Sequence, residues 1–269
     1  MALFSGTLKK MLNELGSGTV DWQKVASLSS GKYDLSGKNA ADGRELVSLL
    51  IRKAAETSSE IPELSMIIRN LSSRGGDFNR SQNETGATPV HIAAGLENGF
   101  LLKALLEAGI PPVAPSHSGS TALHRAVSQG REGNVKLLLT AGADPGAEDG
   151  MSNSPLHIAA RMNGDNGILR LLLEAGAKAY QRNSEGKRPV DLAEESRCAE
   201  CVLLLRESLK NIRRSRTTQW KCPSCSANMK RPPAEKIEWY MGIEMWEHLR
   251  FTCGSCGQVT SALKLDGEV

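Results

Sequence analysis

Hydrophobic residues recur along the chain in short clusters with the spacing of buried helix faces. The clearest clusters are rich in leucine and lie at 101–106, 135–139 and 168–173. Their apolar positions repeat every three or four residues, which is typical of a helix with one buried side. An Ala-Gly pair follows each cluster, and a glycine just past a helix readily adopts the left-handed conformation that ends it. The pattern therefore predicts three helices, which end at Gly109, Gly142 and Gly176.

A second motif precedes each of these helices and keeps the same period. It reads Thr-Pro-Val-His-Ile-Ala, Thr-Ala-Leu-His-Arg-Ala, Ser-Pro-Leu-His-Ile-Ala and finally Arg-Pro-Val-Asp-Leu-Ala, and it begins at Thr88, Thr121, Ser154 and Arg188. Successive copies are 33, 33 and 34 residues apart. A Ser or Thr side chain caps a helix start, and proline fits the first helical position because no backbone donor is lost there. Two markers with one period predict a linear array of two-helix units.

A turn sequence precedes each copy of the motif. It begins with a residue whose side chain can bond the backbone two residues further on, namely Asn83, Ser116, Asp149 or Asn183. Three residues later comes a glycine, which adopts a positive φ without steric cost, except in the third copy, which has Ser152. The period, the motif and the turn together resemble the ankyrin-repeat family, whose T-P-L-H motif and helix–helix–hairpin unit they match.

The resemblance implies a mostly α fold, an ankyrin-repeat solenoid over residues 42–210. We expect a diverged capping repeat at 42–80, followed by repeats at 81–113, 114–146, 147–180 and 181–210. Terminal repeats need one polar face, so loss of the motif at 42–80 is expected. Residues 1–41 contain an amphipathic stretch at helical spacing, made of Phe4, Leu8, Met11, Leu12 and Leu15. It is either an N-terminal cap of the array or an extension that binds a partner, and we favour the cap.

Three motif histidines invite a metal or catalytic interpretation, which the repeat geometry opposes. Packed helices lie roughly 8–10 Å apart, so equivalent imidazoles of successive units cannot all reach one ion. In the ankyrin family this histidine bonds the backbone of a neighbouring unit, and the resemblance carries that role to His91, His124 and His157. Asp191 replaces it in the last copy, so that junction is expected to be bonded differently. The chain contains no P-loop, no G-x-S-x-G and no H-E-x-x-H motif, and we predict that it is not an enzyme.

Ankyrin arrays bind proteins along one concave face, through hairpin tips and first helices. The resemblance carries partner binding to the matching positions, which are Glu84, Thr85, Ala87, Leu96, His117, Ser118, Ser120, Gln129, Met151, Asn153, Arg161, Met162, Glu185 and Lys187. These side chains mix small, polar and apolar groups, and their charges nearly cancel, so a protein or peptide fits them better than a polyanion. We therefore predict a protein-binding adaptor. The alternative without a binding function is an array that serves only as a spacer.

Composition narrows the class of protein further. The 269 residues are 40% hydrophobic and 23% charged, which are globular values. No apolar run approaches the about 20 residues of a membrane span, and no apolar segment follows Lys9 and Lys10 as a secretory signal requires. We expect a cytoplasmic or nuclear protein, in which the six cysteines are thiols or metal ligands and not disulfides.

Four of the cysteines form two C-x-x-C pairs near the C-terminus, Cys222 with Cys225 and Cys253 with Cys256. Two such turns place four thiolates around one ion, and we expect a single structural Zn²⁺ in a β-rich, zinc-ribbon-like domain with rubredoxin-like knuckles over 218–269. The gap between the pairs is longer than the usual spacing of about 15–20 residues. Iron suits four thiolates equally well, and His248 is an alternative ligand, although a surface histidine is the simpler interpretation.

The remaining pair, Cys198 and Cys201, has a different context. By repeat register Cys201 takes a position on the second helix of the last unit, just ahead of a four-residue aliphatic run. We expect Cys201 to be a small buried hydrophobe and Cys198 to lie in the loop between the helices, with a redox or metal role as the less favoured alternative.

Charge is concentrated between the array and the C-terminal cysteines. Residues 206–236 carry a net charge of +7, and residues 237–269 carry −3. We expect a basic linker at 211–217. It suggests an alternative function in which the linker and the ribbon hold DNA or RNA, with cations on phosphate and aromatic rings on bases, at Lys210, Arg213, Arg214, Arg216 and Lys221. A nuclear-import segment and a solvated linker remain open, as does a subunit of an enzyme complex such as a ubiquitin-ligase adaptor. A self-contained RING is disfavoured because its eight ligands are absent.

Overall fold

The computed structural model describes residues 6–36, 40–57, 59–80, 82–162 and 166–215, together with six short strands between 220 and 261. The chain divides into two compact units, Met1–Leu205 and Arg206–Val269. The first unit is helical. Its helices, with the last one continuing into the second unit, are α1 (Gly6–Leu15), α2 (Trp22–Ser29), α3 (Ala40–Glu56), α4 (Leu64–Ser73), α5 (Pro89–Gly95), α6 (Phe100–Glu107), α7 (Ala122–Ser128), α8 (Glu132–Thr140), α9 (Pro155–Arg161), α10 (Gly167–Glu174), α11 (Pro189–Glu195) and α12 (Ala199–Ser215).

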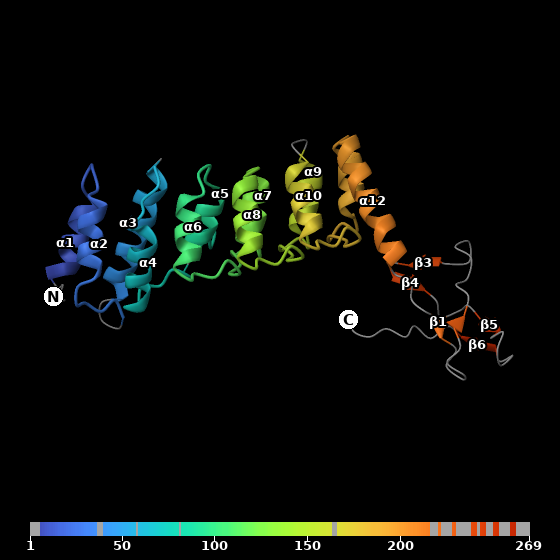
Figure 1. Ribbon diagram of the computed structural model, residues 1–269, viewed down its shortest axis with the longest axis horizontal. Coiled ribbons are helices and arrows are strands. Elements are labelled where there is room, and N and C mark those ends of the chain that lie inside the picture. The colour runs from blue at the N-terminus through green and yellow to red at the C-terminus, as the bar shows by residue number, and fades with distance from the viewer. Residues whose placement is uncertain are drawn as a thin grey trace. The chain divides into compact units, whose positions relative to one another are not determined.

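Within the first unit the helices stand in antiparallel pairs, one pair after another in chain order (Figure 1). α5, α7, α9 and α11 form one layer, in which each helix contacts the next, and α4, α6, α8 and α10 form the other. From α4 onward, the hairpins that connect successive pairs lie at the same end of the pairs (Figure 1). The first unit is therefore a two-layered solenoid in which each pair packs on its neighbours, as the repeat period predicts.

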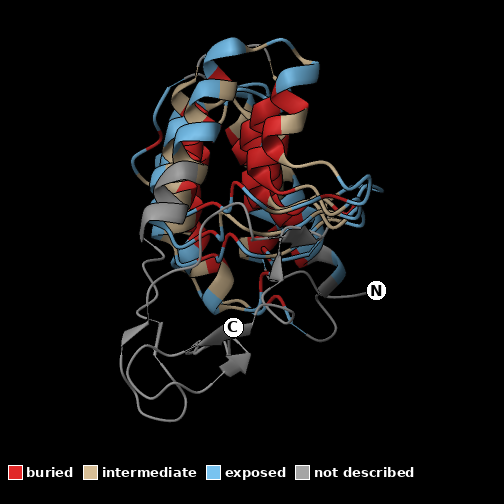
Figure 2. Cartoon of the chain, turned by 90° about the vertical axis from the view of Figure 1, so that its right-hand side faces the viewer, coloured by how far each residue is buried: buried red, intermediate tan, exposed pale blue. Residues whose placement is uncertain are grey.

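The core of the solenoid lies between the two layers (Figure 2). The leucine clusters supply it: Leu101, Leu102 and Leu105 of α6 are buried, and so are the equivalent side chains Val135 and Leu138 of α8 and Ile168, Leu169 and Leu172 of α10. α6, α8 and α10 end one residue before an Ala-Gly pair, and those glycines have positive φ. A leucine at every third or fourth position buries one side of each helix, and this apolar burial is the main stabilising contribution to the array.

The N-terminal residues pack onto the end of the array. α1 buries Leu8, Met11 and Leu15 and contacts α2 and α3, while α2 contacts α4. Phe4 lies outside the described residues. The sequence pattern indicates one helix in this segment, whereas the structure contains two. α2 begins after Asp21, whose side chain accepts a hydrogen bond from the backbone N–H of Lys24 over 3.0 Å. It buries only Val25, Ala26 and Ser29, a signal too short to distinguish from a loop by periodicity.

The described part of the second unit contains the end of α12 and three two-stranded antiparallel hairpins. β1 (Trp220–Lys221) pairs with β2 (Asn228–Met229), β3 (Glu238–Tyr240) with β4 (Ile243–Met245), and β5 (Arg250–Thr252) with β6 (Val259–Ser261). α12 continues through Ser215, so the first five residues of the expected linker at 211–217 are helical. Most of the expected zinc-ribbon-like domain at 218–269, including its cysteines, lies outside the described residues.

Candidate functional site

Three of the four hairpin tips of the array are each organised by one side chain that bonds the backbone. Asn83 Oδ1 accepts hydrogen bonds from the backbone N–H groups of Thr85 and Ala87, over 3.2 and 3.0 Å. Asp149 and Asn183 make the same pair of bonds in the third and fourth hairpins. Ser152 takes the position of the missing glycine at a φ of 53°, a region that disfavours side chains with a Cβ. The tips are therefore closed, hydrogen-bonded turns in which the backbone is fixed.

Neighbouring tips are also bonded to one another. The backbone N–H of His117 donates to the carbonyl oxygen of Thr85 over 3.2 Å, and that of Gly150 donates to Ser118 over 2.7 Å. The next junction repeats the bond, from the N–H of Ser184 to the carbonyl oxygen of Met151 over 2.9 Å. A continuous line of backbone hydrogen bonds thus joins four tips. The spacing of the side chains on them is set by the stacking of the repeats.

The motif histidines fasten each helix start to the following hairpin. The backbone N–H of Thr121 donates to Nδ1 of His124 over 3.1 Å. The neutral ring therefore carries its hydrogen on Nε2, which donates to the carbonyl oxygen of Asn153 over 2.9 Å. His91 makes the same bonds with Thr88 and Ser120, and His157 with Ser154 and Lys187. These imidazoles are structural, as the family resemblance implies, and nothing leaves them free for a metal or a substrate.

Burial lowers the pKa of all three histidines below 6.5, although the hydrogen bonds to backbone act in the opposite direction. Removing a charged imidazolium from water is costly, so the neutral form is favoured inside the array. The last copy of the motif is bonded differently, because Asp191 forms an ion pair with Arg188 over 2.8 Å within its own helix turn. The hydrogen bond from Arg188 lowers the pKa of this carboxyl group.

The predicted partner-binding residues fall into two groups in the structure. The first is at the hairpin tips, where six side chains are exposed: Glu84, Thr85, His117, Ser118, Met151 and Glu185. Four others sit at the base of the hairpins and are half-buried, namely Ala87, Ser120, Asn153 and Lys187. Three of these four supply the carbonyl oxygens that the histidines bond. The outer six are available to a partner, whereas the inner four mainly hold the array together.

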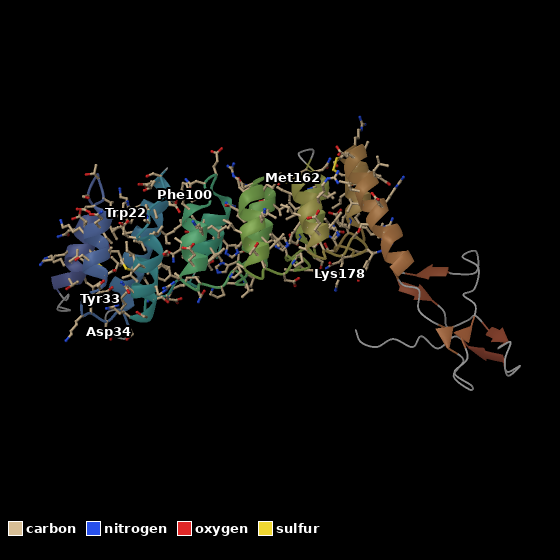
Figure 3. The ribbon with its side chains drawn as sticks, viewed as in Figure 1. Trp22, Tyr33, Asp34, Phe100, Met162 and Lys178 are labelled. Carbon is tan, nitrogen blue, oxygen red and sulfur yellow. A yellow bond between two sulfur atoms is a disulfide. The ribbon has the colours of Figure 1, made fainter. Side chains whose placement is uncertain are left out.

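The second group lies at the opposite end of the helices. Leu96, Gln129 and Met162 are the C-terminal caps of α5, α7 and α9, and Arg161 is the last residue of α9. Figure 3 shows Met162 at this end, away from Lys178 at the hairpin end. A seven-residue helix is about 10 Å long, so the two groups do not form one cluster. The partner-binding residues predicted from sequence thus lie on two separate edges of the array.

Between these two edges lie side chains that the family motif did not indicate as partner contacts. Ile92 and Ile158 are half-buried and Arg125 is exposed, one on each of α5, α9 and α7. They are 33 residues apart, in the position after the motif histidine. Ile92 also lines an open groove with residues of α3 and with Gln82, the others being Ser48, Ile51, Arg52, Ala55 and Glu56. Their 33-residue spacing could have identified them from sequence. The orientation of the first helices decides that these positions reach the surface, whereas the histidines one residue earlier are buried.

Cys198 and Cys201 are joined by a disulfide. This finding corrects the expectation that all six cysteines are thiols or metal ligands. The expected placement is otherwise reproduced, because Cys201 lies in the first turn of α12 and is 2% exposed, and Cys198 directly precedes this helix. The sequence pattern allows the bond, since a turn brings two cysteines three residues apart to a Cα separation of 5.3 Å.

The expected metal and nucleic-acid residues lie mainly where the structure describes little. Cys222, Cys225, Cys253, Cys256 and His248 are outside the described residues, as is Arg216. Lys210, Arg213 and Arg214 belong to α12, and Lys221 to β1. Among the residues that are described, no group of three or more His, Cys, Asp or Glu side chains is placed to hold a metal ion. In the same part of the chain, no helix is both long and apolar enough to cross a membrane.

The fold and its bonding define a helix–helix–hairpin solenoid, and comparison with known families places the chain more closely. A family model for ankyrin repeats in three copies matches residues 40–149, and one for ankyrin repeats in many copies matches residues 138–193. Together the matches span residues 40–193, more than half of the chain, and the chain belongs to the ankyrin-repeat family. Neither match indicates a catalytic family. No match was found among curated proteins.

Proposed function

We propose that this protein is an adaptor that binds a protein partner along the hairpin tips of its ankyrin array. The observation that carries the proposal is the line of backbone hydrogen bonds between tips, which presents exposed side chains on a fixed scaffold. A surface that is already ordered loses little conformational entropy on binding, so its contacts translate more fully into affinity. Ankyrin repeats are interaction modules, which agrees with this function.

The chemistry of the tips favours a protein partner. The exposed group contains two acidic residues, Glu84 and Glu185, the apolar Met151, and the polar Thr85, His117 and Ser118. Met151 is 54% exposed, so its apolar side chain is accessible to a partner at the third tip. A nucleic acid would require a positively charged surface, which these side chains do not form. We infer that the partner presents an apolar contact to Met151, flanked by polar and basic groups.

A site-specific photocrosslinker in the full chain tests this function. We would place the crosslinker at Met151 and, as a matched control, at the exposed Lys136 on α8 in the other helix layer. Irradiation in an extract of the native cells should give a discrete protein adduct from Met151 and none from Lys136. An excess of unlabelled wild-type chain should suppress the adduct, and a Met151→Glu chain should not. Equal adducts from both positions, or an adduct that a nuclease removes, would contradict the proposal.

We also propose that Cys222, Cys225, Cys253 and Cys256 hold one structural Zn²⁺, which would make the second unit a zinc-ribbon-like docking module. Support comes from the strands: the first pair falls in sequence directly after β1 and before β2, and the second pair directly after β5 and before β6. Each C-x-x-C pair therefore occupies the connection of an antiparallel hairpin, where the zinc knuckles of a ribbon are formed. Four thiolates complete a tetrahedral shell, which is typical of a structural ion.

Elemental analysis of the purified full chain tests the metal proposal. We expect about one zinc ion per chain, lost when Cys225 and Cys256 are both changed to Ser, because a site with two thiolates cannot complete the shell. Cys198→Ser is the matched control and should retain the metal. Iron in place of zinc would revise the identity of the ion, and absence of any metal from the wild-type chain would overturn the proposal.

A further inference from the structure

The disulfide in the last repeat joins a half-buried cysteine to a buried one. Cys198 directly precedes α12 and is half-buried, whereas Cys201 is 2% exposed in the first turn. We propose that this pair is a thiol–disulfide exchange site, which cycles between a disulfide and a dithiol by reaction with a thiol reductant such as glutathione or a protein dithiol. This inference is independent of the adaptor function and of the zinc site.

Access to the pair is one-sided. Cys198 is half-buried and lies just outside α12, whereas Cys201 is 2% exposed within its first turn. A thiolate in solution therefore reaches Cys198 more readily than Cys201, whose burial shields the second sulfur. Because thiol–disulfide exchange depends on access to the attacked sulfur, the geometry assigns Cys198 as the sulfur that reacts first.

The exchange can be written with every bond accounted for. The reductant thiolate attacks Cys198 Sγ, forms a mixed disulfide with it, and displaces Cys201 as a thiolate, which takes up a proton. A second thiol of the reductant, or a second reductant molecule, then attacks the reductant sulfur of the mixed disulfide and releases Cys198. The protein pair gains two electrons and two protons, and the reductant leaves as its own disulfide. Oxidised glutathione drives the same steps in reverse.

The surroundings of the two sulfurs can stabilise the reduced pair. The backbone N–H of Cys201 points at Cys198 Sγ over 3.3 Å, so the first turn of α12 offers a donor to a thiolate at this position. Oδ1 of Asn166 lies 3.0 Å from Cys201 Sγ. A disulfide sulfur has no hydrogen to donate, so this amide oxygen gains a donor only when Cys201 is a thiol. Each sulfur of the reduced form therefore has a partner that suits it.

The pair can be followed separately from the four C-terminal cysteines. Trypsin cleaves after Arg197 and Arg206, and the peptide 198–206 contains Cys198 and Cys201 and no other cysteine. We would equilibrate the full native chain over a series of reduced-to-oxidised glutathione ratios, trap thiols with an alkylating reagent, and quantify this peptide by mass spectrometry. The peptide should pass from disulfide to dithiol within the series, with the same midpoint from both directions. If the pair in the native chain stays oxidised in excess reduced glutathione, or never oxidises in excess oxidised glutathione, the proposal is wrong.

Single substitutions test which sulfur reacts. In Cys201→Ser, the half-buried Cys198 should trap a glutathione adduct on peptide 198–206, whereas in Cys198→Ser the buried Cys201 should react at least about tenfold more slowly. Asn166→Ala should make the midpoint about fivefold more reducing, because the reduced pair loses one hydrogen bond to its thiol. Asn79→Ala, an exposed asparagine far along the chain, is its control and should leave the midpoint unchanged. Equal reactivity of the two cysteines would refute the assignment of Cys198.

Discussion

Replacing His124 by leucine tests the bonding that connects successive repeats. His124 is 1% exposed, and a leucine fills a similar volume, so the change removes hydrogen bonds without opening a large cavity. The ring contacts the backbone N–H and the hydroxyl of Thr121 over 3.1 and 2.9 Å and the carbonyl oxygen of Asn153 over 2.9 Å. All three contacts are lost in His124→Leu. The carbonyl oxygen of Asn153 keeps a second donor, the N–H of Asp149.

The expected cost follows from these contacts. A buried hydrogen bond contributes about 1 kcal/mol net, and a buried donor left without a partner costs about 1 kcal/mol or more. The N–H of the half-buried Thr121 is left without this partner, whereas the carbonyl oxygen of Asn153 keeps a donor. We therefore expect His124→Leu to lower the free energy of unfolding by about 3 kcal/mol.

Urea unfolding followed by far-ultraviolet circular dichroism measures this loss. The matched control is His117→Leu, because His117 is an exposed histidine whose ring makes one hydrogen bond, to the carbonyl oxygen of Glu84 over 3.1 Å. That variant should lose no more than about 1 kcal/mol. If the two variants unfold at the same urea concentration, the inter-repeat histidine bond contributes nothing and the reasoning is refuted.

The same histidine should also change the pH dependence of stability. Burial lowers the pKa of His91, His124 and His157 in the folded state, so below the unfolded value of 6.5 the unfolded chain binds more protons than the folded chain. Stability is therefore fully present above pH 6.5 and falls as the pH drops toward the folded pKa values, by up to about 1.4 kcal/mol per pH unit for each histidine. His124→Leu should reduce this slope by about one third; an unchanged slope would contradict the assignment.

Four further substitutions address packing and backbone conformation in the same unfolding assay. Leu138→Ala, at a fully buried position of α8, should cost about 3 kcal/mol, whereas Leu203→Ala, at a position 67% exposed, should change the free energy of unfolding by less than about 0.5 kcal/mol; similar losses would contradict the two-layered core. Ser152→Gly should stabilise the array by about 1 kcal/mol, because Ser152 has a φ of 53°. Gly119→Ala should destabilise it by more than about 1 kcal/mol, since Gly119 has a φ of 74° and a Cβ there would lie 2.9 Å from the backbone nitrogen of Gly150. A stabilising Gly119→Ala would show that the tips are less closely packed than the structure indicates.

The sequence by itself determined the repeat, and with it most of the fold. The period, the helix caps and the leucine clusters are local features that act within one unit, and identical local features every 33 or 34 residues leave stacking as the way to bury the apolar faces. They also predicted the structural role of the motif histidines through the family resemblance. The weakly patterned helix α2 was missed, because an eight-residue segment with few buried side chains has little periodicity of its own.

Tertiary structure alone decided how the surface is divided. In sequence, Met151 and Met162 are 11 residues apart and belong to one list of candidates, but α9 separates the hairpin tip that carries one from the helix end that carries the other. Tertiary structure also decided that Asn166, 35 residues before Cys201, lies against its sulfur. Contacts between units depend on the packing of one repeat on the next, which no single unit encodes, and so they emerge only when the array is assembled.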